Sequence, residues 1–291
     1  MSYLLMVSAT LFLSACGISA SFYNRKNADK TSASPIYNVI QMGAVFLLWL
    51  VKFLLNPEIN LAVLPYSFLF ALGYVAAMVS SVYAYREGSL VLSSLIMQLS
   101  MITTSIWGFF VWNSPVTPTI IIGLVLVVLT LWLCLYPGKQ KENEKKKITP
   151  KWILFISIYF VGNSLGSIVQ RTQQLDFKSE FGDFLMVVAT GIGFVFVLFR
   201  FILADKRDLK AIVKGSWYLP AVAGSLNFFI NFIVITLATS ELSPTLVYPF
   251  IAVGSLALNT LASLFVFKEK MRWWQWLGVA VGAVAIILLS I

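Results

Sequence analysis

The polar side chains best able to bind a small molecule in this chain recur at helical spacing inside long apolar segments. In the segment 243–267, small or polar side chains follow one another three or four residues apart, at Tyr248, Ala252, Ser255 and Asn259. Residues at this spacing share one face of a helix. Such a face inside an apolar segment predicts either a polar cavity or hydrogen bonds to a neighbouring helix.

A second apolar segment, residues 89–112, carries a comparable face, formed by Ser93, Met97, Ser100 and Thr104. Two matching faces on related helices would suit a cavity between two halves of a molecule, and the alternative is helix packing through small polar groups. The candidate substrate-binding residues of this segment are Gln98, Ser100, Thr104 and Trp107, the last as a ring on which a substrate could stack.

Three asparagines in other apolar segments are further candidates for substrate binding. Asn227 and Asn231 are four residues apart, so their amides lie on the same face of a helix. Asn163 lies between Gly162 and Gly166, a glycine spacing that allows two helices to approach closely. Because an amide is costly in hydrocarbon, each of the three is expected to line a cavity or to bond to another helix.

Pro249 lies within the segment that carries Tyr248 and Asn259. A proline inside a helix lacks the amide hydrogen for the bond to residue 245 and kinks the helix. A kink beside a cavity is a candidate gate, and the alternative is a static bend.

Several kinds of chemistry are missing from the sequence. The chain has no histidine, which excludes a Ser-His-Asp relay and histidine metal ligands. Its two cysteines, Cys16 and Cys134, have no metal-binding spacing, so neither a metal nor a cofactor is expected. No carboxylate or cation lies in the middle of an apolar segment. The expected ligand is therefore a neutral, zwitterionic or amphipathic small molecule, without proton coupling through a central carboxylate.

The elements that must position these residues are membrane-spanning helices. The chain is 59% hydrophobic and 11% charged, whereas soluble domains carry about 25% charged residues. A helix needs about 20 apolar residues to cross a bilayer. The expected fold is an all-α polytopic membrane protein with ten transmembrane helices, at residues 3–23, 35–55, 63–85, 89–112, 119–136, 152–170, 183–204, 217–238, 243–267 and 273–290.

The basic residues predict how these helices are oriented. The net charge is +9, but the charge lies in loops rather than on a folded domain, so nucleic acid is not an expected partner. Of the 21 lysines and arginines, all but Lys52, Arg171 and Lys178 lie in loops on one side. Cytoplasmic loops are enriched in these residues. The Lys-rich segment 138–151 is therefore expected in the cytoplasm, with both termini outside, in a bacterial cytoplasmic membrane.

The Lys-rich segment also divides the chain into two similar parts. Residues 1–137 and residues 152–291 each contain five of the expected helices, with 138–151 as the linker. Two repeats with an odd number of helices have opposite orientations, which is the plan of many secondary transporters.

One gap-free shift of the sequence supports the repeat. The shift that places Ile96 on Ile251 also places Ser100 on Ser255. It covers two expected helices of each part together with the loop between them.

The end of the chain resembles a known family. Residues 263–269, which end in Glu269, are followed by Trp274 and by Gly278 and Gly282. This pattern, like residues 238–249 before it, resembles the EamA-type repeat of the drug/metabolite transporter superfamily. The first part is more divergent and has Ser114 at the position of Glu269. Members of this superfamily are usually drawn with cytoplasmic termini, which is opposite to the orientation that the basic residues predict.

The resemblance and the inverted halves imply a permease that moves a small metabolite or drug-like molecule by alternating access. Its expected partners are the lipid bilayer and a small-molecule substrate, and the chain is expected to be a monomer or a homodimer. The alternatives are a flippase for a lipid-linked sugar, an intramembrane lipid-modifying enzyme, and a membrane scaffold or sensor. The enzyme is disfavoured because histidine is absent and the carboxylates are scattered.

Overall fold

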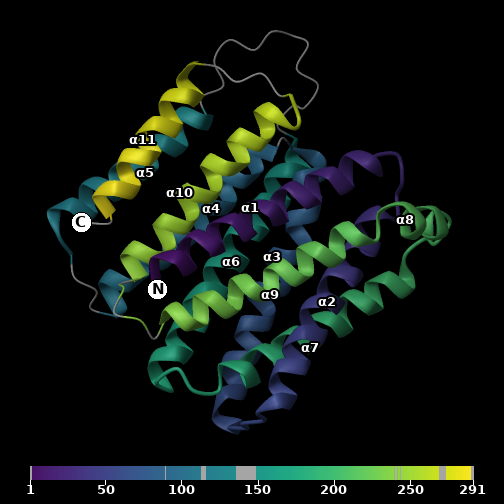
Figure 1. Ribbon diagram of the computed structural model, residues 1–291. Helices are drawn as coiled ribbons and strands as arrows, with labels where there is room; N and C mark the ends of the chain where they lie inside the picture. The colour runs from purple at the N-terminus through teal and green to yellow at the C-terminus, as the bar shows by residue number, and fades with distance from the viewer. Residues whose placement is uncertain are drawn as a thin grey trace.

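The computed structural model describes residues 2–88, 90–112, 116–135, 149–238, 240, 242, 244–268 and 273–289, and the ordered elements in these ranges are all helical (Figure 1). They are α1 (Ser2–Lys26), α2 (Ala33–Leu55), the one-turn 3-10 helix η1 (Leu61–Val63), α3 (Leu64–Glu87), α4 (Leu90–Val111), α5 (Pro118–Leu135), α6 (Pro150–Asp176), α7 (Gly182–Leu203), α8 (Leu209–Ser216), α9 (Tyr218–Ala238), α10 (Pro244–Phe265) and α11 (Trp273–Leu289).

Seven helical segments of the described chain are long and apolar enough to cross a membrane: α1, α2, η1 with α3, α6, α7, α9 and α10. Their outer faces carry exposed apolar side chains such as Leu72, Val195 and Leu203. In water these faces would be unfavourable, whereas in a bilayer they meet lipid. The expectation of an all-α polytopic membrane protein is confirmed.

The structure differs from the predicted helices in two places. Helix α6 continues to Asp176, although the apolar segment ends near Gln170. Its last turns are mostly polar, with Gln173 and Gln174 buried, and Gln173 donates a hydrogen bond to the backbone of Glu180. Helix α8 is short and amphipathic, with Ile212 buried. Neither feature produces a long apolar segment, which is why hydropathy alone missed both.

The start of α6 is defined by local sequence. Thr149 caps the helix because its hydroxyl accepts a hydrogen bond from the backbone amide of Trp152, at 3.1 Å. Pro150 takes a first-turn position, where a missing amide hydrogen costs nothing. The rest of the predicted linker, residues 138–148, lies outside the described residues.

The most extensive helix contacts join the part before the linker to the part after it. The main pairs are α3–α6, α5–α11, α1–α9, α4–α10, α2–α7, α2–α9, α1–α10, α3–α7 and α4–α6. In Figure 1, α5 and α11 lie side by side at one edge of the bundle, and α2 and α7 lie toward the opposite edge. The two parts therefore interdigitate, and each of the two largest apolar clusters contains residues from both parts.

Helices α3 and α6 touch through their backbones. A Cβ atom added at Gly162 would lie 2.6 Å from the carbonyl oxygen of Gly73, and one added at Gly73 would lie 2.5 Å from that of Gly162. At Gly166 the nearest atom would be 3.7 Å away, on Phe70. The predicted close approach is confirmed, and Gly162 is the residue of its pair that requires it.

This contact predicts opposite effects at the two glycines of α6. Gly162→Ala would force the helices apart and is expected to cost about 1–3 kcal/mol of stability. Gly166→Ala is expected to be neutral or slightly stabilising, because alanine is the better helix former. Thermal unfolding in detergent measures both. Equal melting temperatures for the two variants would contradict the packing.

Candidate functional site

A small cavity with a partly polar lining, here called the polar cavity, lies among five helices in the interior of the bundle. It is lined by residues of α1, α3, α6, α9 and α10 and has a volume of about 90 Å³. Its polar lining is formed by Tyr74, Tyr159, Asn163, Ser167, Gln170, Asn227, Asn231 and Tyr248. Helices from both sides of the linker contribute to it, and the surrounding helix faces are apolar.

Four side chains form a hydrogen-bonded network along one wall of this cavity. The hydroxyl of Tyr74 donates to the amide oxygen of Asn227. Asn231 donates to the same oxygen at 2.9 Å and to the backbone carbonyl of Asn227 at 3.0 Å. Gln170 in turn donates to the amide oxygen of Asn231 at 3.5 Å. The network connects α3, α6 and α9.

The network leaves hydrogen-bonding capacity for a ligand. An asparagine amide carries two N–H donors. Among the described residues, the amide nitrogen of Asn227 has only the sulfur of Met78 as a partner, at 3.8 Å. Sulfur is a weak acceptor, so an oxygen of a bound molecule would be a better partner for Asn227.

Asn163 lies at the boundary between the cavity and α4. It lines the cavity and donates to the hydroxyl of Ser100 at 2.8 Å. Next to it, Ser164 donates to the carbonyl of Ser100 at 3.2 Å. Ser100, a candidate on α4, therefore does not line the cavity itself. It is connected to the cavity by its hydrogen bond with Asn163.

Asn259 serves a different purpose from the cavity asparagines. It is 1% exposed and joins three helices, because it accepts from Ser14 of α1 at 2.8 Å and donates to Ser94 of α4 at 3.0 Å. Both ends of its amide are therefore occupied. Asn259 is not among the residues that line the cavity.

The remaining candidates lie away from the cavity. Ser255 is buried and donates to a carbonyl of its own helix, and Gln98 and Thr104 are buried on α4. These side chains lie on helices that pack against each other, as the alternative of helix packing implies. Trp107 is 43% exposed on the outside of the bundle, so the structure does not bring it to the polar cavity.

Tyr248 is the residue of the α10 face that does line the cavity. Pro249 follows it, is buried, and lies within the continuous helix α10. The role of Pro249 as a gate stays a prediction.

Sequence reasoning missed four polar lining residues: Tyr74, Tyr159, Ser167 and Gln170. Tyrosine is common in apolar segments, so Tyr74 and Tyr159 gave no distinct signal. Gln170 was placed at a helix end. The sequence does contain one signal for this wall of the cavity: Asn163, Ser167 and Gln170 are spaced so that they share one face of a helix.

Arg171 follows the predicted helix 152–170 but lies within α6. Arg171 is partly buried and lies close enough to Tyr248 for an electrostatic interaction.

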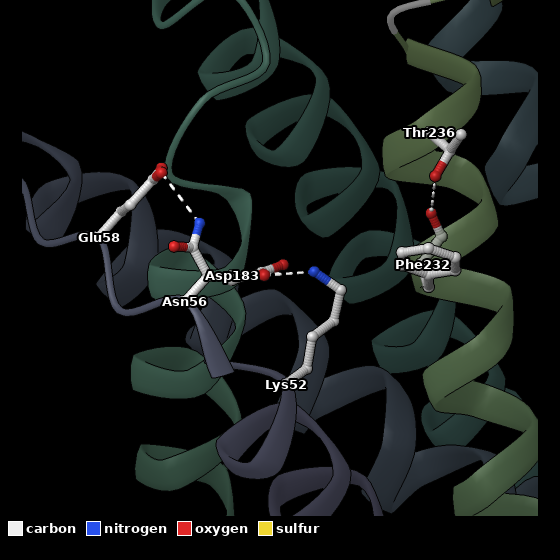
Figure 2. Close-up of polar contacts among 6 residues, drawn as sticks. All are labelled: Lys52, Asn56, Glu58, Asp183, Phe232 and Thr236. Atoms are coloured by element: carbon white, nitrogen blue, oxygen red, sulfur yellow. Dashed lines mark hydrogen bonds and ion pairs between the residues drawn. The ribbon is translucent and has the colours of Figure 1, made fainter. Parts of the chain in front are cut away.

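Lys52 lies in the last turn of α2. It forms an ion pair with Asp183 at the start of α7 (Figure 2). Its ammonium lies 5.4 Å from the ring centre of Phe232 on α9. At the same end of α2, Asn56 donates a hydrogen bond to the carboxylate of Glu58 (Figure 2). Lys52 thus connects the end of α2 to α7 and α9.

Comparison with known proteins supports the fold. No protein-family model matches the chain. A protein from Haemophilus influenzae, described as uncharacterized, is 24% identical over 207 residues, which are 71% of this chain and 68% of that protein. A solved crystal structure, described only as that of a protein, matches with a TM-score of 0.68 at 11% identity, over 99% of this chain and 96% of the other. At this identity the likeness shows a shared fold alone.

The two kinds of asparagine site predict different effects on stability. Asn259→Ala removes two buried hydrogen bonds and leaves the hydroxyls of Ser14 and Ser94 without these partners, so it is expected to cost about 2 kcal/mol. Asn231→Ala is expected to cost less than about 1 kcal/mol, because water in the cavity can replace the amide. Melting temperatures in detergent measure both. A larger loss for Asn231→Ala would contradict these assignments.

Proposed function

We propose that the protein is a secondary transporter that moves a small polar molecule across the membrane by alternating access. The observation that carries this proposal is the amide- and hydroxyl-lined cavity between helices from both sides of the linker. Polar groups inside a membrane bundle are costly unless they serve a partner or a cavity. Substrate sites of secondary transporters lie at the interface between repeats.

The pattern of helix contacts supports an arrangement of ten transmembrane helices as two repeats. In this arrangement the first repeat consists of α1, α2, α3, α4 and α5. They correspond, in that order, to α6, α7, α9, α10 and α11 of the second repeat. The pair α3–α6 then corresponds to α9–α1, α2–α9 to α7–α3, and α1–α10 to α6–α4. The pairs α2–α7, α4–α10 and α5–α11 correspond to themselves. Because each repeat has five helices, the two would be inverted.

A reciprocal contact between α2 and α7 supports the same axis. A Cβ atom added at Gly43 would lie 3.2 Å from the ring of Phe194, and one added at Gly191 would lie 3.2 Å from the ring of Phe46. The two rings are stacked, with their centres 5.8 Å apart and their planes at 12°. Each helix thus presents a glycine and a phenylalanine to the other in the same order, as a two-fold axis between them requires.

We also propose the finer assignments that rest on the sequence. The chain is an EamA-type member of the drug/metabolite transporter superfamily, on the resemblance of residues 238–290. It lies in a bacterial cytoplasmic membrane, which the bacterial source of its relative supports. The Lys-rich linker is cytoplasmic and both termini are outside, on the distribution of basic residues.

The size of the cavity indicates a closed state in this proposal. The cavity measures about 90 Å³. Sites for drug-sized ligands measure about 300–1,000 Å³. The helices therefore have to move apart before a substrate enters, which is the motion that alternating access supplies.

The proposal predicts that cavity variants lose ligand binding while packing variants keep it. Purified protein in detergent is screened with amino acids, nucleosides, sugars and organic cations for a rise in melting temperature. Asn231→Ala and Tyr74→Phe are expected to weaken the apparent affinity for a hit at least tenfold, about 1.4 kcal/mol. Ser255→Ala, a buried change on α10 away from the cavity, is the control.

Uptake of the same hit into proteoliposomes completes the test. A hit that both cavity variants bind as well as the wild type would contradict the site. Binding without uptake would contradict transport and would favour a sensor or an intramembrane enzyme. Movement of a lipid-linked sugar, in place of any soluble hit, would favour the flippase.

A further inference from the structure

A long apolar groove runs over the outside of the bundle between α3, α6 and α7. Its volume is about 600 Å³, several times that of the central cavity. The groove uses a different face of α3, since Val75 and Val79 line the groove whereas Tyr74 and Met78 line the cavity. Its lining is almost entirely hydrocarbon, and it is separate from the proposed transport site.

One residue of the lining is charged. Arg200, in the last turn of α7, lies at the end of the groove where Tyr83 and Phe155 also lie. Its guanidinium donates to the hydroxyl of Tyr83 at 3.1 Å and lies 5.7 Å from the ring centre of Tyr83. Tyr83 is stacked on Phe155 with ring centres 4.8 Å apart. These contacts hold the guanidinium at the groove.

Arg200 has no carboxylate partner among the residues that the structure describes. Lys52 provides an internal comparison, because it has the same position in the last turn of α2. Lys52 is neutralised by Asp183, whereas Arg200 is bound only to a neutral hydroxyl. A cation at the edge of hydrocarbon is costly without a counter-charge. Arg200 therefore has the free charge to bind an anion.

The geometry points to an anionic phospholipid as the occupant of this groove. The phosphate would bind to Arg200 and the hydroxyl of Tyr83, and an acyl chain would lie along α3. Arginine suits phosphate because its planar fork can donate two hydrogen bonds at once. The groove itself lies on a face where Phe68, Leu72 and Phe196 are exposed, as lipid contact requires.

The length of the groove fits a complete acyl chain. Along α3 it extends from Phe68 to Tyr83, roughly 22 Å at 1.5 Å per residue. One leaflet contains about 15 Å of hydrocarbon.

The segment after α7 adds positive charge near the same end of the groove. It contains Lys206 and also Arg207, which is paired with Asp205, and it continues into the amphipathic helix α8, which buries Ile212 and exposes Lys210 and Lys214. A basic amphipathic helix favours anionic lipid headgroups.

Native mass spectrometry of the delipidated full chain tests this inference. Phosphatidylglycerol and phosphatidylcholine with identical acyl chains are added, and bound lipid and melting temperature are measured. The wild type is expected to bind phosphatidylglycerol at least fivefold more tightly than phosphatidylcholine. Arg200→Gln is expected to abolish this preference. Tyr83→Phe, which keeps the ring but removes the hydroxyl, is expected to reduce it two- to threefold.

Lys178→Gln is the control, because it removes one positive charge from the opposite end of the bundle and should keep the preference. A normal melting temperature of Arg200→Gln in phosphatidylcholine shows that the variant folds. The inference is overturned if the wild type has no preference or if Arg200→Gln retains it. It is also overturned if inorganic phosphate stabilises the protein as much as phosphatidylglycerol does.

Discussion

A polar group inside a membrane bundle has no bulk water to bond to, so it needs a partner or a cavity. This constraint organises the interior of the protein. Backbone groups are satisfied within the helices, and several buried hydroxyls donate to a carbonyl of their own helix, as Thr190 and Ser255 do. One such bond does not satisfy an amide, which has two N–H donors and an acceptor oxygen, so the asparagines of α9 and α10 also bond to neighbouring helices or face the cavity.

The asparagines of α9 and α10 are used in two distinct ways. Asn259 is enclosed by two serines from neighbouring helices and is bonded at both its amide oxygen and its amide nitrogen. Asn227 and Asn231 bond to each other and to Tyr74, but face a cavity and leave a donor nitrogen beside a sulfur. The first arrangement stabilises the fold. The second leaves binding capacity at the centre, which the proposed function uses.

Much of the fold follows from the sequence, because hydropathy is a local property. Helix α7 begins and ends within a residue of the predicted segment, and the glycines of α6 predicted a close approach that Gly162 makes. The site was only partly predictable. Periodicity identifies which residues share a face, but the direction of that face depends on packing against distant segments. Asn231 and Asn259 therefore looked equivalent in the sequence.

The same limit explains why Tyr74 was missed and why Trp107 was a candidate. Tyr74 became part of the site because α3 approaches α6 across two glycines and brings its hydroxyl to Asn227. Trp107 lies on the outward face of α4. Whether Arg171 lies in a helix or in a loop depends on where α6 ends. The last turns of α6 are polar, so hydropathy does not indicate that end.

The central claim is that the polar cavity opens to each side of the membrane in turn. Asn231→Cys in a background without Cys16 and Cys134 can be labelled with a membrane-impermeant thiol reagent in right-side-out and inverted vesicles. The account predicts labelling in both preparations, while Ser255→Cys, buried on α10, stays unlabelled in both. Labelling of Asn231→Cys from one side only, or from neither, would contradict alternating access to this cavity.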